Sequence, residues 1–149
     1  MGRNAHTDGQ LMEYIWIKPS LLKDYWGLIK PGLMKVQHHG EGWICEDVYA
    51  AIKSGTANLH IANVDNEYAG FVVMSLTPST DGVNLHIWAA YSNQNNPHLL
   101  EASMPEFDRW ARDAGAGRIT FHSPRKGWEK VGTKIGFVPT MTIFERAVS

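Results

Sequence analysis

The residues with the clearest chemical potential lie where an apolar run, VNLHIWAAY, passes through the polar loop SNQNNPH into a helical pattern. The start of a helix can bind an anion, because its first backbone N–H groups have no intrahelical partner and the helix dipole is positive there. Loops that approach a phosphate closely usually contain glycine, and residues 92–97 contain none. The pattern therefore predicts at most a weak anion site, contributing about 0.3–1 kcal/mol in an exposed setting.

A metal site is the second chemistry to consider, since His38 and His39 lie near Glu41 and Cys45. Adjacent residues on an extended chain point in opposite directions, and this spacing matches no structural zinc motif. We therefore predict no metal site and interpret the segment as a polar loop between helices.

Three other histidines, His60, His86 and His122, each alternate with apolar residues in a predicted strand. Such positions would allow all three to face one side of a sheet, where imidazole groups could act as ligands. Buried or half-buried histidines that bond to the backbone or to helices are the commoner arrangement, so the sequence does not predict that they are ligands.

Tryptophan and basic side chains indicate where a partner would dock. Trp43 and Trp128 are flanked by glycine and charged residues, which predicts that these two lie near the surface while most other tryptophans are in the core. Arg125 and Lys126 adjoin Trp128 and form a basic and aromatic cluster with it. These four residues are the predicted interaction points, although a solvated helix end would have the same composition.

The composition is that of one soluble domain. The chain has 149 residues, of which 44% are hydrophobic and 19% charged, and its net charge of -1 shows no footprint of nucleic-acid or membrane-surface binding. Cys45 is the single cysteine, which excludes an internal disulfide and fits a reducing compartment. No apolar run reaches the roughly 20 residues of a membrane span. Residues 1–10 lack the apolar centre of a signal peptide, so we expect a protein that is not secreted.

Hydrophobic periodicity predicts the elements that must position these groups. Period-two patterns predict strands, and apolar residues three and four apart predict helices. Pro31 and Gly32 are expected to interrupt the first helix. The predicted order is a strand at 11–17, helices at 21–30 and 45–54, a three-strand meander at 57–64, 68–77 and 83–91, a helix at 97–114, a strand at 117–123, a short helix and turn at 125–137, and a final strand at 140–148.

This order, together with the segment GRITFHSPRKGWEKVGTKIGF, resembles the GNAT superfamily of acyl-CoA N-acyltransferases. The closing KIGFVPT is similar to the family's ending, in which a short helix leads to a Gly-Phe pair and a final strand. The segment EFDRWARDAGAGRITFHSPRKGW is more narrowly similar to GNAT-like proteins carried by bacteriophages.

The resemblance implies an α/β (α+β) fold. Residues 11–149 are expected to form a single GNAT-like domain with a mixed, mostly antiparallel central sheet and two helices on each face. We expect the strand at 83–91 to be central and to splay from the strand at 118–122. Residues 1–10 are predicted to be a polar N-terminal arm, whose order must come from a neighbour or from the domain's own surface.

The resemblance also implies where a cofactor would bind. GNAT enzymes hold the pyrophosphate of acetyl-CoA on a loop patterned Arg/Gln-x-x-Gly-x-Gly/Ala, between the fourth strand and the third helix. The corresponding candidates here are Trp88, Ala90, Ser92, Asn93, Gln94, Asn95 and Asn96. Gln94 supplies a polar opening residue, but no glycine follows it. We therefore expect no cofactor, or weak acetyl-CoA binding if the protein is an enzyme.

A second expected feature of the family is also absent. In many GNAT enzymes a tyrosine five residues before the phenylalanine of the Gly-Phe pair acts as general acid, and Gly132 occupies that position here. Glu46, Asp47 and Glu67 are conceivable bases, but the sequence places none of them in a cleft. The sequence therefore predicts no catalytic residue.

Two functions remain open at this stage. The first is a bacteriophage-type protein that has lost acyl transfer and acts as a structural or interaction component, in a virion or in the cytoplasm of a host cell, with protein partners or a larger assembly. The alternative is a divergent acetyl-CoA-dependent N-acetyltransferase, and a small-ligand binding module is a third reading. The two missing features favour the first.

Overall fold

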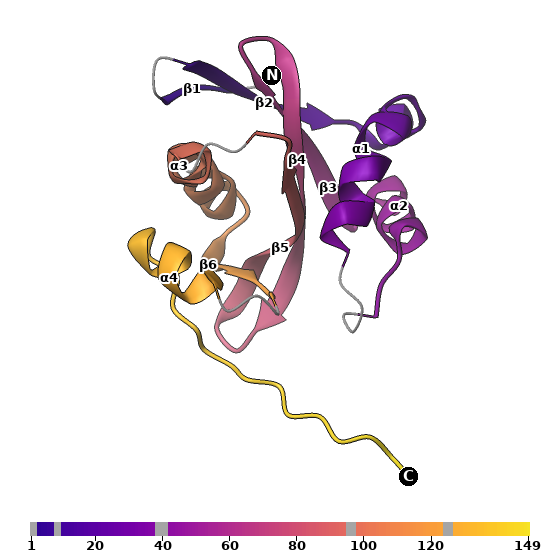
Figure 1. The fold of residues 1–149 in the computed structure, drawn as a ribbon, viewed down its shortest axis with the longest axis vertical. Coiled ribbons are helices and arrows are strands. Elements are labelled where there is room, and N and C mark those ends of the chain that lie inside the picture. Colours follow the sequence, from indigo (N-terminus) through magenta and orange to yellow (C-terminus); the bar gives the residue numbers. More distant parts are fainter. Residues whose placement is uncertain (1–2, 8–9, 38–41, 95–97, 124–126) are drawn as a thin grey trace.

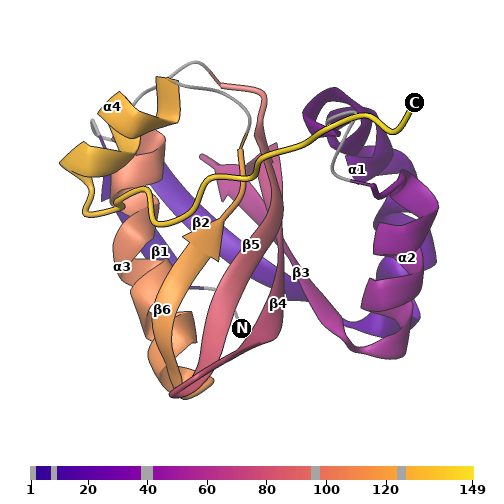
Figure 2. The ribbon, with the colours of Figure 1, turned by 90° about the horizontal axis from the view of Figure 1, so that it is seen from below.

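The computed structural model describes residues 3–7, 10–37, 42–94, 98–123 and 127–149, which form a twisted sheet with helices against both faces (Figures 1 and 2). The strands are β1 (Arg3–Thr7), β2 (Gln10–Ile17), β3 (Ala57–Val64), β4 (Glu67–Ser79), β5 (Gly82–Ser92) and β6 (Ala116–Phe121). The helices are η1 (Pro19–Leu21), α1 (Leu22–Val36), α2 (Cys45–Ser54), α3 (His98–Asp113) and α4 (Gly127–Lys134).

The six strands lie side by side in sequence order, with β1 at one edge and β6 at the other. Neighbouring strands are antiparallel from β1 to β5, and the β5–β6 pair is parallel. This confirms the predicted mixed, mostly antiparallel sheet. The strand at 83–91 was predicted to be central in the sheet, and this prediction is wrong. Among the described residues no strand lies beyond β6, so β5 is next to the edge of the sheet.

Local turn chemistry explains the meander of β3, β4 and β5. Asp65 and Asn66 have positive φ angles of 52° and 67°, a conformation that these two residue types tolerate and that a two-residue hairpin turn requires. The second turn is tighter than the sequence suggests. β4 continues through Pro78, which pairs with Val83, and ends at Ser79.

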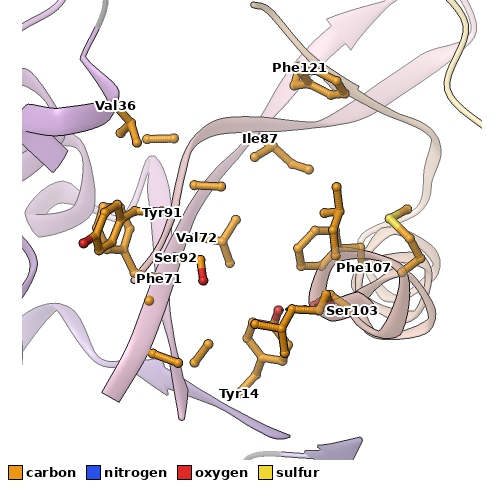
Figure 3. Close-up of a pocket in the computed structure, with 18 of the residues that line it drawn as sticks. Tyr14, Val36, Phe71, Val72, Ile87, Tyr91, Ser92, Ser103, Phe107 and Phe121 are labelled. Atoms are coloured by element: carbon orange, nitrogen blue, oxygen red, sulfur yellow. Dashed lines mark hydrogen bonds between the residues drawn. The ribbon is translucent and has the colours of Figure 1, made fainter. Parts of the chain in front are cut away.

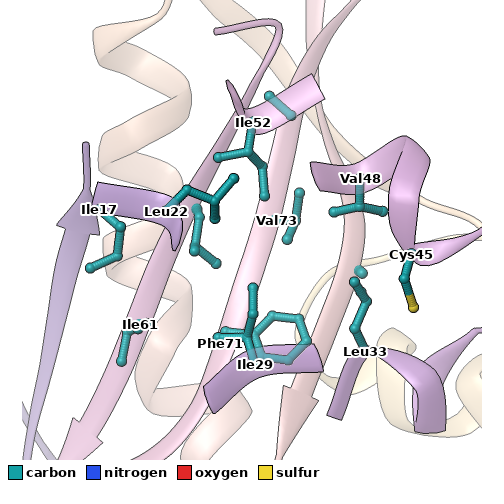
Figure 4. Close-up of a cluster of buried hydrophobic side chains, with 13 residues drawn as sticks. Ile17, Leu22, Ile29, Leu33, Cys45, Val48, Ile52, Ile61, Phe71 and Val73 are labelled. Carbon is teal, nitrogen blue, oxygen red and sulfur yellow. The ribbon is translucent and has the colours of Figure 1, made fainter. Parts of the chain in front are cut away.

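Two hydrophobic clusters hold the layers together, one on each face of the sheet. α1 and α2 cover one face, whereas α3 and α4 lie on the other (Figure 1). Ile29 and Val48 pack with Phe71 in the first cluster (Figure 4), and Phe107 packs with Val72 in the second. Successive residues of β4 thus serve opposite faces, which is the strand periodicity expected of a sheet covered on both sides.

The first helix continues through the residues that were expected to interrupt it. α1 runs from Leu22 to Val36 with Pro31 inside it. Ile29 and Leu33 on either side of the proline are both fully buried, so tertiary packing outweighs the lost backbone hydrogen bond.

The segment expected to be a polar arm contributes a strand. Residues 3–7 form β1, which pairs antiparallel with β2 from Arg3 opposite Tyr14 to Thr7 opposite Gln10. Backbone hydrogen bonding to β2 does not depend on apolar side chains, and this explains how a polar sequence is ordered by the domain's own sheet.

The predicted strand at 140–148 is not formed. The chain passes through Gly136, whose φ is 93°, and Phe137 packs on Phe121 at a ring distance of 5.0 Å. Residues 138–149 then run away from the domain without regular structure (Figures 1 and 2). A strand pattern alone is not sufficient, because a strand needs a neighbour with which to pair.

Candidate functional site

The pairing of β5 changes partway along the strand. Val73 of β4 lies opposite Ala89, but Met74 lies opposite Ile87, so Trp88 is an extra residue in a β-bulge. The parallel pairing of β5 with β6 ends at Ile87 opposite Phe121, immediately before the bulge. The two strands therefore separate at their carboxyl ends, which is where α/β sheets commonly bind ligands.

An apolar cavity of about 350 Å³ lies at this opening (Figure 3). Its walls include residues of both diverging strands, and Figure 3 shows Val36 and Tyr91 on one side of the β5 ribbon, with Ile87 and Phe107 on the other. The cavity therefore has walls on both faces of the sheet. Its volume is at the lower end of the range for small-molecule sites, roughly 300–1,000 Å³.

The backbone of β5 supplies polar groups to this apolar cavity. Residues 89–92 pair with β4 on one side, and residues 88–92 have no partner on the β6 side among the described residues. Trp88, Ala90 and Ser92, which the sequence placed at a cofactor site, all line the cavity. An unpaired strand edge offers alternating N–H and C=O groups, so this edge can bind the amides of an extended ligand as if they belonged to another strand.

The described part of the following loop uses its donors within the protein. The backbone N–H of Asn93 donates to the Ala69 carbonyl at 2.8 Å, and the backbone N–H of Gln94 donates to Ser92 Oγ at 3.1 Å. Asn93 Nδ2 donates to the Tyr68 carbonyl at 3.1 Å. These three donors are therefore hydrogen-bonded within the protein.

Asn95 and Asn96, the remaining two candidates in the loop, lie outside the described residues. The same applies to Arg125 and Lys126 among the predicted interaction points, and to His38, His39 and Glu41. The structure therefore gives no position for any of these side chains.

Tyr14 and Ser103 form a buried polar pair at the cavity wall under α3. The Tyr14 hydroxyl is hydrogen-bonded to Ser103 Oγ, and Ser103 Oγ–H donates to the Leu99 carbonyl at 2.7 Å. Burial raises the pKa of the Tyr14 phenol, partly opposed by the bond to Ser103. Tyr14 is therefore neutral and oriented from β2, a role that the sequence did not reveal because the two residues lie 89 positions apart.

The three strand histidines do not share one face. His60 stacks on Trp110 of α3 with ring centroids 4.2 Å apart. His86 and His122 lie on the opposite face by strand alternation, with ring centroids 4.7 Å apart, and His86 Nδ1 is 2.9 Å from Thr120 Oγ1. His122 also lines the cavity and is exposed, so it is an imidazole at the mouth of the opening.

Tyr91 forms the wall of the cavity toward α1, where two glycines permit its position. A Cβ at Gly32 would lie 2.5 Å from Tyr91 Cδ2, and a Cβ at Gly70 would lie 2.0 Å from the Tyr91 carbonyl oxygen. Burial, together with the neighbouring Tyr91, raises the pKa of Tyr68 to about 12. The Tyr68 hydroxyl is buried without a hydrogen-bond partner among the described residues.

The tryptophans do not divide simply into surface and core residues. Trp43 packs on Trp88 at 6.0 Å and Trp128 packs on Phe121 at 5.0 Å, and both are half-buried. Trp16, which the sequence did not single out as a surface residue, is 47% exposed on β2. Trp88 and Trp128 line the cavity, which places their aromatic surface at the candidate site.

The residues considered for acid and base chemistry lie elsewhere. Gly132, at the position of the family's tyrosine, is buried beside Phe137. The Asp47 carboxylate accepts the Ile44 N–H at 2.9 Å and so caps α2. Glu46 and Glu67 are exposed and do not line the cavity.

The described residues contain neither a metal-binding cluster nor a membrane-spanning helix. No group of three or more His, Cys, Asp or Glu side chains there is arranged to hold a metal ion. None of the described helices has both the length and the apolar character needed to cross a membrane.

Solved structures of acetyltransferases resemble this fold. Aminoglycoside N-acetyltransferase AAC(6')-Iy in complex with CoA is 17% identical and matches with a TM-score of 0.63, covering 97% of each chain. A predicted acetyltransferase with acetyl-CoA from Clostridium acetobutylicum is 15% identical at a TM-score of 0.65, covering 91% of this chain and 96% of its own. Ribosomal-protein-alanine N-acetyltransferase from Brucella melitensis is 11% identical at a TM-score of 0.62, covering 93% and 99%.

These matches show that the chain has the GNAT acetyltransferase fold, as the sequence resemblance implied. No family model matches the sequence, and no curated protein is significantly similar to it. The bacteriophage and virion interpretation has no support from the comparisons, and the solved structures named above show the fold of this chain.

Proposed function

We propose that the protein is a divergent N-acetyltransferase that transfers an acetyl group from acetyl-CoA to an amine. The observation that carries this proposal is the opening at the Trp88 bulge, where β5 and β6 separate around a cavity with walls on both faces of the sheet. A thioester donor and an amine can approach such an opening from opposite faces, so the sheet itself would bring the reacting atoms together.

The described residues fit the pantetheine arm of acetyl-CoA better than its pyrophosphate. The unpaired edge of residues 88–92 suits the two amides of the pantetheine arm, and Phe121, Trp128 and Phe137 provide apolar surface beside it. The backbone donors of Asn93 and Gln94 are already used, so they do not contribute to pyrophosphate binding. The affinity for acetyl-CoA would therefore come mainly from contacts with its pantetheine arm.

The chemistry requires a proton acceptor and a group that stabilises negative charge on oxygen. The amine nitrogen bonds to the carbonyl carbon, the carbon–sulfur bond breaks, and the amine loses a proton. Backbone N–H groups of residues 88–90 would stabilise the transient oxyanion, and His122 at the mouth would accept the proton. A thiol has a pKa of about 8.5, so its thiolate can leave near neutral pH without the tyrosine that Gly132 replaces.

Thermal unfolding with and without acetyl-CoA tests the proposal. A ligand that binds only the folded state stabilises it by RT ln(1 + [L]/Kd), which is about 2.7 kcal/mol at a hundredfold excess over Kd. Ala90→Trp places a large side chain in the opening and should abolish this stabilisation. Ala50→Trp makes the same change on the exposed surface of α2 and should retain it.

Two further measurements complete the test. Acetyl-pantetheine, which lacks the nucleotide and pyrophosphate, should bind within about tenfold of acetyl-CoA, since the arm supplies most of the contacts. Release of the free thiol in the presence of a panel of amines should follow donor binding. Failure of acetyl-CoA to stabilise the wild-type protein at any concentration would remove the basis for the acetyltransferase assignment.

A further inference from the structure

The cavity extends far beyond the opening at Trp88. The opening lies on β5, but the cavity is also lined by residues of β4, β3 and β2 on the sheet face that α3 covers: Ala69, Val72, Ala62, Val64, Met12 and Tyr14. Adjacent strands lie about 4.8 Å apart, so β2 is roughly 14 Å from β5 across the sheet. An acetyl group held at the opening would therefore occupy a small part of this cavity.

Helix α3 covers this part of the cavity, which we call the α3 pocket. Leu99, Ser103 and Phe107 line it from the helix, and because they are spaced four residues apart they lie on one face of α3. Figure 3 shows Ser103 and Phe107 on α3, with Val72 of the sheet facing them. Met12 is 2% exposed and Leu99 is 8% exposed. The walls of the α3 pocket are therefore shielded from solvent, and the pocket is continuous with the opening on β5.

The walls of the α3 pocket are uncharged. None of the described residues that line the cavity is an Asp, Glu, Lys or Arg. The side-chain hydroxyls in the pocket belong to Tyr14 and Ser103, which are hydrogen-bonded to each other, and Ser103 also donates to the Leu99 carbonyl at 2.7 Å. Because these hydroxyls already have partners, they do not require a polar ligand. The pocket therefore suits an alkyl chain and opposes a charged group.

The dimensions of the cavity indicate how long such an alkyl chain is. A carbon–carbon bond of about 1.5 Å advances an extended chain by roughly 1.3 Å, so about eight carbons reach the roughly 10 Å from β5 to β3. A CH₂ group is similar in size to a water molecule, which takes about 30 Å³ in the liquid, so eight carbons need roughly 240 Å³. The cavity of about 350 Å³ accommodates that volume. Protein interiors rarely contain voids of this size, which indicates that a ligand fills it.

We propose that the preferred donor carries a medium-length acyl group of about six to ten carbons, whose alkyl chain lies in the α3 pocket. This inference rests on the proposed function, which places the thioester carbonyl at residues 88–90. The amine nitrogen bonds to the acyl carbonyl carbon, the carbon–sulfur bond breaks, the thiolate leaves, and His122 accepts the amine proton. Acetyl-CoA binds through the same pantetheine contacts but leaves the α3 pocket empty.

The other face of the sheet remains available to the amine. Val36 and Tyr91 line the cavity on the side of the β5 ribbon opposite Phe107 (Figure 3). An alkyl chain in the α3 pocket and an amine beside Tyr91 therefore do not compete for the same volume. Donor and acceptor can be bound at the same time, as transfer between them requires.

A series of CoA thioesters of increasing acyl length tests the inference by titration calorimetry. Affinity should rise about fourfold for each added carbon from acetyl to octanoyl, because each CH₂ group leaves water, and should not rise further at dodecanoyl. Equal affinities for acetyl-CoA and octanoyl-CoA would overturn the inference and leave the acetyltransferase proposal standing. If no thioester of the series binds, both proposals are overturned.

A substitution in the middle of the α3 pocket provides a matched test. Ala62→Phe should lower the affinity for octanoyl-CoA at least about thirtyfold and change that for acetyl-CoA by less than about twofold, since it removes space that only the longer acyl group uses. Ala50→Phe makes the same change on the exposed surface of α2 and should alter neither affinity. Ala62→Leu, a smaller change, replaces Ala62→Phe if that variant does not fold. Equal losses for both thioesters would overturn the inference.

Nuclear Overhauser effects locate the alkyl chain directly. The terminal methyl group of bound octanoyl-CoA should show contacts with the methyl groups of Ala62 and Leu99 in the α3 pocket. Contacts with Trp88 and Tyr91 but none with Ala62 would place the alkyl chain on the α1 side of the sheet. Contacts between Ala62 and octylamine, added together with acetyl-CoA, would assign the pocket to the acceptor. Either of these two results overturns the proposal.

Discussion

The protonation of His60 makes a quantitative prediction about stability at acidic pH. Its side chain stacks on Trp110, and its Nδ1 is buried without a hydrogen-bond partner among the described residues. Burial, with a smaller contribution from nearby Arg109, lowers the pKa of His60 from its ordinary value of 6.5 to about 4. The folded protein therefore holds this ring neutral where the unfolded chain would bind a proton.

Proton linkage determines whether a change of pH raises or lowers the free energy of unfolding. Between pH 6.5 and 4 the unfolded state carries more protons than the folded state, so the free energy of unfolding falls as the pH falls through this window. Between pH 7.5 and 4.5 the loss from this one group is about 2.5 kcal/mol. His60→Phe keeps an aromatic ring against Trp110 but cannot be protonated, so it should remove that loss.

Urea unfolding of both proteins at a series of pH values provides the measurement. Other groups titrate in the same range, so the quantity to compare is the difference in unfolding free energy between wild type and His60→Phe at each pH. As the pH is lowered from 7.5 to 4.5, the unfolding free energy of His60→Phe should rise by about 2.5 kcal/mol relative to that of the wild type. A difference that stays constant across the window would refute the reasoning, because it would show that His60 is protonated as readily in the folded state as in the unfolded chain.

Three further substitutions test the site and its supports. Gly70→Ala should destabilise the domain by more than about 2 kcal/mol in urea unfolding, because the new Cβ would meet the backbone carbonyl oxygen of Tyr91 at 2.0 Å; an unchanged midpoint would contradict that contact. Ser103→Ala should cost about 1–3 kcal/mol, since it leaves the buried Tyr14 hydroxyl without its partner, and the double variant with Tyr14→Phe should be more stable than Ser103→Ala alone. His122→Asn should lower kcat for acetyl transfer by about 10²–10⁴ with acetyl-CoA affinity unchanged; an equal kcat would assign proton transfer to another group.

Much of the fold was predictable because its determinants are local. The α2 helix ends at Ser54 because Gly55 adopts a φ of 85°, which glycine does without strain. Asp65 and Asn66 specify the first hairpin in the same way, and the two-residue alternation of β3 predicts its bounds of 57–64. Each of these signals lies within a few residues of the structure that it determines.

Contacts between distant residues overruled local signals at several points. Pro31 normally ends a helix, but burial of Ile29 and Leu33 against the sheet keeps α1 continuous. The polar residues 3–7 become a strand because β2 offers them backbone partners. Residues 140–148 have a strand pattern and form no strand, because the partner that a strand requires is not specified by its own sequence.

Some features of the candidate site follow from the sequence alone, and others depend on the tertiary structure. The sequence by itself determined the candidate segment Trp88–Asn96, the absence of glycine in its loop and the glycine at position 132, because these are properties of residue type and order. Only the tertiary structure decided that Trp88 bulges, that β5 and β6 separate after Ile87, and that Tyr14 meets Ser103. Those features depend on register and packing between segments far apart in the chain, which a linear pattern does not encode.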